Sequence, residues 1–87
     1  ERKAIARGLY GRIELVKSPA VADYKVYVTN NSSSADLLVQ VVDGLANSPG
    51  RWQIVKGAPD FRVYIANNAA AADLLIYFVN AGPGPTR

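Results

Sequence analysis

Cysteine, histidine and methionine are all absent from the 87 residues of the sequence. Without cysteine the chain can form no disulfide, no thiolate nucleophile and no thiolate metal site. Without histidine it lacks the side chain that most often serves as an acid–base group or metal ligand near neutral pH. No apolar run approaches the roughly 18 residues of a membrane-spanning helix. These absences favour a binding or structural role, and we expect no enzymatic activity, no cofactor, no metal and no membrane span.

An excess of charge of one sign is confined to the N-terminus. The net charge is +3, residues 1–12 hold four basic side chains against one acidic, and residues 13–87 are neutral. Phosphate contacts dominate affinity for nucleic acid, so a neutral body argues against strong non-specific binding. Within the basic arm, Ile5, Leu9 and Tyr10 predict that part of it docks on the body as an extra strand.

Internal similarity is the strongest pattern in the chain. Residues 25–44 and 62–81 are identical at nine of twenty aligned positions, and most of the other differences are conservative. The preceding segments, 11–24 and 50–61, also resemble each other. The sequence therefore divides into two related modules.

Each module divides again into three units that open with five residues in which the second and fourth are apolar. These pairs are Ile13/Leu15, Val26/Val28, Val39/Val41, Trp52/Ile54, Val63/Ile65 and Ile76/Phe78. Such alternation, with β-branched and aromatic residues enriched, predicts six strands with one buried face. Trp52 takes the place of Ile13, so we interpret it as a core residue.

The segments between the strands predict turns. Asparagine oxygens in residues 30–32 and 67–68 are suited to capping a single helical turn over 33–37 and 69–74. Parallel neighbours usually need crossovers of about a dozen residues, and these connections are shorter. We therefore expect mostly antiparallel strands in a small barrel or sandwich, with a triangular arrangement of three units per coil as the alternative.

The fold class predicted is mainly β, with six short strand–turn units in two pseudo-symmetric halves and one or two single helical turns. The predicted organisation is an N-terminal arm at 1–11, a single domain at 12–81 made of modules 12–50 and 51–81, and an irregular tail at 82–87. No pattern in the chain indicates a compartment.

The segments KVYVTNNSSSADL and RVYIANNAAAADL resemble an uncharacterised family of short bacterial proteins built from tandem VYVVDSxxxADLK-type units. The resemblance covers roughly residues 12–80. The chain departs from that pattern by having paired asparagines where the family often has Asp–Ser. The resemblance implies a repeat architecture and carries no activity with it.

The outward positions of the predicted strands supply the candidate binding residues. They are Lys25, Tyr27, Arg51, Arg62, Tyr64 and Tyr77. Tyrosine rings flanked by cations can stack on bases or sugars while the cations meet phosphates or carboxylates. Tyrosine is also common in strands, and basic side chains protect strand edges, so a purely structural interpretation is favoured.

Aspartate recurs near the end of four units, at Asp23, Asp36, Asp60 and Asp73. Calcium sites need several oxygen ligands close together, and each unit offers one carboxylate. We expect these carboxylates to accept backbone N–H bonds in their own turns, or to pair with a nearby base.

The functional prediction is a non-enzymatic binding or self-assembly module that presents a strand face or edge to a protein or to a second copy of the chain. The outward apolar residues Leu75 and Val79 favour association. The alternative is weak binding of nucleic acid or anionic glycan through these tyrosine, lysine and arginine side chains.

Overall fold

The computed structural model describes residues 2–86. The strands are β1 (Gly11–Val16), β2 (Tyr24–Val28), β3 (Leu37–Val41), β4 (Arg51–Ile54), β5 (Phe61–Ile65), β6 (Leu74–Phe78) and β7 (Gly84–Pro85). The helical segments are α1 (Arg2–Gly8) and three single 3₁₀ turns, η1 (Pro19–Val21), η2 (Ser32–Ser34) and η3 (Ala69–Ala71). The mainly β fold class is confirmed.

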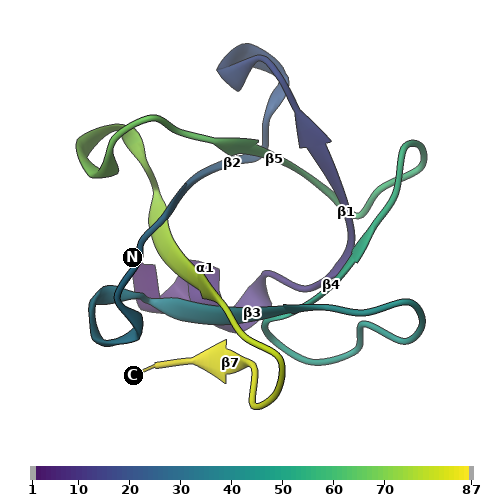
Figure 1. Cartoon of the computed structure of the whole chain (residues 1–87). Coiled ribbons are helices and arrows are strands. Elements are labelled where there is room, and N and C mark those ends of the chain that lie inside the picture. The colour runs from purple at the N-terminus through teal and green to yellow at the C-terminus, as the bar shows by residue number, and fades with distance from the viewer. Residues whose placement is uncertain (1, 87) are drawn as a thin grey trace.

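Six of the strands close into a small barrel (Figure 1). The order around the ring is β1, β5, β2, β6, β3, β4, and β4 pairs again with β1. Every one of these six pairings is parallel. The expectation of mostly antiparallel strands was therefore wrong. Of the two architectures expected, a small barrel or a sandwich, the structure has the barrel.

The two halves of the chain interleave in this ring. Strands that hold corresponding places in the two modules lie side by side: β1 beside β4, β2 beside β5 and β3 beside β6. Successive strands along the chain are two places apart in the ring, except β3 and β4, which are direct neighbours. The second module therefore fills the gaps that the first module leaves.

Short strands allow short parallel crossovers. A five-residue strand is about 17 Å long, and a neighbour two places away lies about 10 Å across the sheet. The eight residues 29–36 between β2 and β3 span up to about 26 Å when extended. A crossover of this length therefore returns to the starting end of the barrel without a full helix.

The crossovers run outside the ring, over the strand that they skip (Figure 1). η1 lies against β5, η2 against β6 and η3 against β2. Asn31 and Asn68 cap η2 and η3 by accepting backbone N–H bonds at 3.0 Å, as the sequence predicted. Ser18 caps η1 in the same way, at 3.3 Å.

Each strand contributes a fully buried inward residue to the core that fills the barrel. These residues are Ile13, Val26, Val39, Trp52, Val63 and Ile76, all with no exposed surface. In β3 and β6 the inward residue before it, Leu37 or Leu74, is fully buried as well. Burial of apolar surface on this scale is the main favourable term in folding. The expected core role of Trp52 is confirmed, and its indole N–H donates to the Leu9 carbonyl oxygen at 3.1 Å.

The N-terminal segment closes the end of the barrel at which the strands begin. It forms the helix α1, not the extra strand that we expected, because Ala6 on the helix and Leu9 just after it both reach the core. Leu9 has no exposed surface, whereas Tyr10 is 37% exposed. In Figure 1, α1 lies at the far end of the barrel and is faded by distance.

The tail contains a short strand where irregular structure was expected. β7 pairs antiparallel with the start of β3, through Leu37 and Leu38. The Thr86 hydroxyl holds it in place by donating to the Ala35 carbonyl oxygen at 2.6 Å. β3 pairs with β4 only from Gln40 onward, so β7 pairs with the part of β3 that β4 does not reach.

Candidate functional site

The four recurring aspartates all make the same two-point contact. The backbone N–H of each donates to the carbonyl oxygen of a residue on a neighbouring strand at 2.7 Å. One carboxylate oxygen then accepts the N–H of that same residue at 2.7–3.0 Å. The pairs are Asp23 with Arg62, Asp36 with Leu75, Asp60 with Arg12, and Asp73 with Lys25. We call each of these contacts an aspartate clasp.

Each clasp joins a crossover to the strand that it passes over. Asp23 ends the crossover that skips β5, and its partner Arg62 lies on β5. The other three clasps follow the same rule. The connection from β3 to β4 skips no strand, and it has no aspartate at its end. The carboxylates do accept backbone N–H bonds, as expected, but from residues 39 or 48 positions away and not from their own turns.

The predicted binding residues are spread around the outer wall. Five of the six lie on three consecutive strands: Arg62 and Tyr64 on β5, Lys25 and Tyr27 on β2, and Tyr77 on β6. Arg51 lies on β4, which is opposite β2 in the ring. A single flat partner therefore cannot contact the whole set.

The tyrosines of this set are half-buried on strands that the crossovers cover. Tyr27 lies on β2 beneath η3, Tyr64 on β5 beneath η1, and Tyr77 on β6 beneath η2. Arg62 is paired with Glu14 on β1, with 3.4 Å between its Nε and the carboxylate oxygen Oε1. These positions give the rings a packing role beneath the crossovers. In the register, only Lys25 and Tyr64 form a direct basic–aromatic pair between neighbouring strands.

An apolar ring surrounds the end of the barrel at which the strands finish. Its members are the last inward residues of the six strands: Leu15, Val28, Val41, Ile54, Ile65 and Phe78. Five of them are exposed by 39–52%, and Val28 is half-buried. The sequence pattern predicted that all six lie on a buried face. They are exposed because α1 covers only the opposite end of the barrel.

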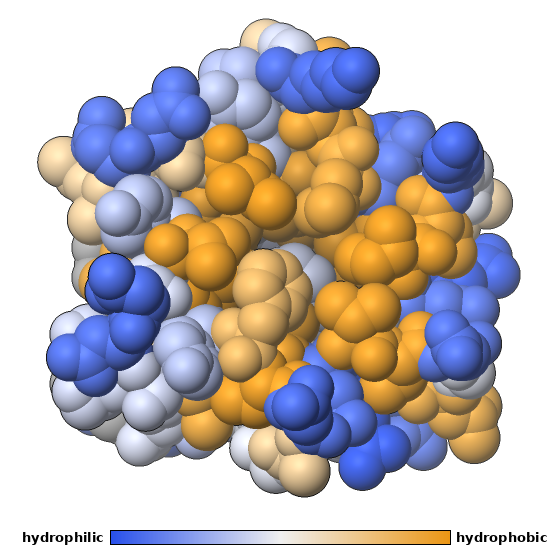
Figure 2. All heavy atoms as spheres, in the orientation of Figure 1, coloured by the Kyte–Doolittle hydropathy of each residue, from blue (hydrophilic) through white to orange (hydrophobic). Residues whose placement is uncertain are grey.

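Figure 2 shows this end as a continuous hydrophobic surface with a hydrophilic border. The charged residues that follow the strand ends here are Lys17 after β1, Asp43 after β3 and Lys56 after β4. Phe78 packs inward against Trp52, with ring centroids 6.4 Å apart and edge to face. Leu75 and Val79, expected as outward apolar contacts, are both half-buried instead, and the Leu75 N–H donates to Asp36. We call the six exposed or half-buried residues at this end, from Leu15 to Phe78, the apolar ring.

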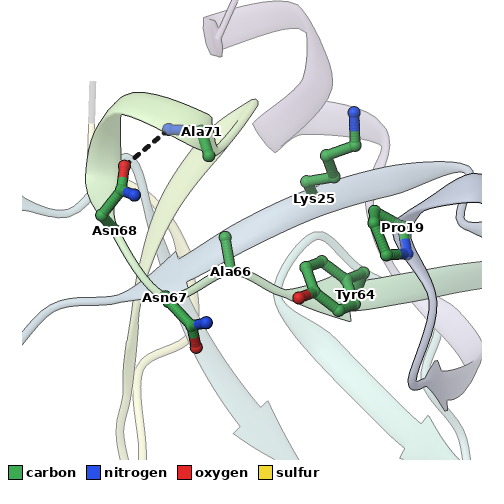
Figure 3. Close-up of a pocket in the computed structure, with 7 residues that line it drawn as sticks. All are labelled: Pro19, Lys25, Tyr64, Ala66, Asn67, Asn68 and Ala71. Atoms are coloured by element: carbon green, nitrogen blue, oxygen red, sulfur yellow. Dashed lines mark hydrogen bonds between the residues drawn. The ribbon is translucent and has the colours of Figure 1, made fainter.

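A second feature is a pocket of about 460 Å³ on the outer wall. It brings together Lys25 and Tyr64 from the predicted set, with Pro19 of η1 on one side and Asn68 at the start of η3 on the other (Figure 3). The other predicted residues do not line it.

The described part of the chain holds no group of three acidic side chains placed to bind a metal ion. Within residues 2–86, no helix is long and apolar enough to cross a membrane. No buried side-chain nitrogen or oxygen of these residues lacks a hydrogen-bond partner.

Comparison with known proteins gives one result. Residues 6–86 match the family described as the 7(1) septoil knot domain. No curated protein and no solved structure matches the chain. The match takes in all seven strands, including β7, and the name describes a knotted chain, which accords with the interleaved path of the two halves. The chain belongs to the septoil knot domain family.

Proposed function

We propose that the protein is a non-enzymatic self-association module and that its contact surface is the apolar ring. The function class is the one predicted from the sequence, but the contact surface is the open end of the barrel and not a strand face or edge. Closure of the barrel pairs the six main strands on both sides, so these strands offer little free edge. The observation that carries the proposal is a circle of apolar side chains exposed by about two-fifths to one-half.

Exposure of this ring favours association. Monomeric proteins rarely expose large contiguous apolar patches, and those with a polar border commonly mark interaction sites. The ring has this form (Figure 2). Removing such a surface from water releases free energy in proportion to the apolar area covered.

The charges around the ring favour a second copy of the chain as the occupant. Asp43 follows β3 and Lys56 follows β4, and these two strands are neighbours. A twofold axis passing between them, with two barrels end to end, places Lys56 of each copy near Asp43 of the other. A self-complementary patch of this kind is what a twofold dimer requires. The small size of the patch predicts weak association, with a dissociation constant in about the micromolar range.

Light scattering coupled to size exclusion tests this proposal. The wild-type chain should show a concentration-dependent dimer that persists in high salt, because an apolar interface is not screened by ions. Val41→Lys places a charge in the ring at its most exposed member and should give a monomer. Val21→Lys, at an exposed position of η1 outside the ring, is the matched control and should leave the dimer unchanged. A wild-type chain that is monomeric at every concentration would refute the proposal.

The resemblance to bacterial tandem-repeat proteins belongs to the same proposal. It is supported by the side-by-side placement of corresponding strands in the two modules. A septoil knot domain built from two copies of one three-strand module would acquire its interleaved ring from that duplication.

A further inference from the structure

The pocket on the outer wall is formed where two crossovers pass over neighbouring strands. η1 crosses β5 and η3 crosses β2, and the pocket lies between the two turns. Figure 3 shows Pro19 and Asn68 on opposite sides, with Ala66 between them. Its volume of about 460 Å³ is within the range of small-molecule sites, roughly 300–1,000 Å³.

Lys25 brings a positive charge to the pocket. The residues that line the pocket include no acidic side chain, and no salt bridge to Lys25 is found among residues 2–86. Arg62 on the adjacent strand is different, because Glu14 neutralises it. The Asp73 N–H donates to the Lys25 carbonyl oxygen at 2.7 Å, and the Asp73 carboxylate accepts the Lys25 N–H at 2.9 Å. These two bonds fix the backbone from which the Lys25 side chain extends.

The other polar side chains of the pocket can each donate a hydrogen bond. The carbonyl oxygen of the Asn68 side chain accepts the Ala71 N–H at 3.0 Å, which leaves its amide NH₂ available to a ligand. Asn67 brings a second amide and Tyr64 a hydroxyl. Pro19 and Ala66, together with the Tyr64 ring, supply apolar surface that the face of a sugar or base ring can contact.

From this arrangement we infer that the pocket binds a small organic anion whose carboxylate or phosphate is attached to a ring. The anion contacts Lys25 and the amide NH₂ of Asn68, and the ring of the ligand lies against Tyr64 and Pro19. Charge-assisted hydrogen bonds of this type are stronger than neutral ones. The site is independent of the apolar ring, because none of the apolar-ring residues lines the pocket.

Titration of the isotope-labelled full chain, followed by backbone and side-chain amide NMR, tests the inference. The probes are glucuronate and adenosine monophosphate, two ring-bearing anions from different sources. Glucose, adenosine and inorganic phosphate are their controls, which carry the ring or the charge alone. At least one of the two anions should shift the amides of Ala66, Asn67, Asn68 and Ala71, and its controls should bind at least about tenfold more weakly.

Two variants locate the binding. Lys25→Gln removes the charge but keeps a polar side chain, and it should weaken binding of the anion by about tenfold. Lys17→Gln removes an equal charge outside the pocket and should leave the affinity unchanged. The inference is overturned if neither anion binds, if glucose, adenosine or inorganic phosphate binds as well as the matching anion, or if Lys25→Gln binds like the wild-type chain.

Discussion

At the scale of single residues, the aspartate clasp explains why aspartate recurs near the end of four units. Asp23, Asp36, Asp60 and Asp73 each satisfy one N–H and one C=O of a neighbouring strand. Their recurrence was evident in the sequence, but their partners were not. A clasp joins residues 39 or 48 positions apart, and no local pattern encodes such a distance.

Loss of one clasp should destabilise the barrel by an amount typical of a helix cap. Asp60→Ala leaves the Arg12 N–H without its acceptor, so we expect the free energy of unfolding to fall by about 1–2 kcal/mol. Chemical denaturation measures the change. Asp43→Ala, which removes a carboxylate outside the clasps, should change stability by less than about 0.5 kcal/mol. Equal effects of the two substitutions would show that the clasp contributes nothing specific.

Gly11 is held to glycine by the same clasp. Its φ angle is +109°, and a Cβ built on it would lie 2.5 Å from the Asp60 carboxylate. Gly11→Ala should therefore destabilise the protein by about 1–3 kcal/mol.

A double-mutant cycle separates the two causes of this strain. When Asp60 is already alanine, Gly11→Ala should cost less, because the contact with the carboxylate is gone and only the backbone term remains. Strictly additive losses in the double variant would contradict the contact.

At the scale of elements, the positions of the strands were predictable and their directions were not. Alternation of apolar residues located all six main strands and identified one fully buried inward position in each, although it missed the buried Leu37 and Leu74 at the starts of β3 and β6. Direction depends on how far a crossover must travel, and four- to six-residue strands shorten that path enough for parallel pairing. The helix α1 was missed although its Ala, Arg and Lys residues favour a helix, because the apolar residues Ile5, Leu9 and Tyr10 were interpreted as an extra strand.

The candidate site shows the same division. The sequence named Lys25 and Tyr64, and their pairing across β2 and β5 arises from the parallel register. Tyr27 and Tyr77 face out as predicted, yet the crossovers above them were not foreseen. The apolar ring was identified as apolar but assigned to the core, since alternation shows which face a residue is on and not whether that end of the barrel is covered.

The closing role of α1 leads to a prediction about Leu9. This side chain is fully buried next to Trp52, whose indole donates to the Leu9 carbonyl. Leu9→Ala should lower the free energy of unfolding by about 2–5 kcal/mol, the range for cavities in well-packed cores. Thermal or chemical unfolding provides the measurement. Leu45→Ala is the control, because Leu45 is 79% exposed and its truncation should have little effect. A small effect of Leu9→Ala would mean that α1 is not part of the core.

At the scale of the whole molecule, the barrel has one covered end and one open end. α1 and Leu9 cover the end where the strands begin, and the apolar ring surrounds the end where they finish (Figures 1 and 2). In this septoil knot domain, closure of the parallel ring pairs the strands of both modules on both sides. The chain therefore forms a parallel sheet without a large helical layer. Without such a layer one end of the barrel is left uncovered, and the proposed dimer would cover it.

The central claim is that the open end is the contact surface, and amide NMR of the labelled wild-type chain over a wide range of concentration tests it most directly. We expect concentration-dependent shifts at the apolar-ring residues and at the strand-end charges Asp43 and Lys56, with none at α1. Shifts that are absent, or that gather on the outer wall or around α1, would contradict the claim.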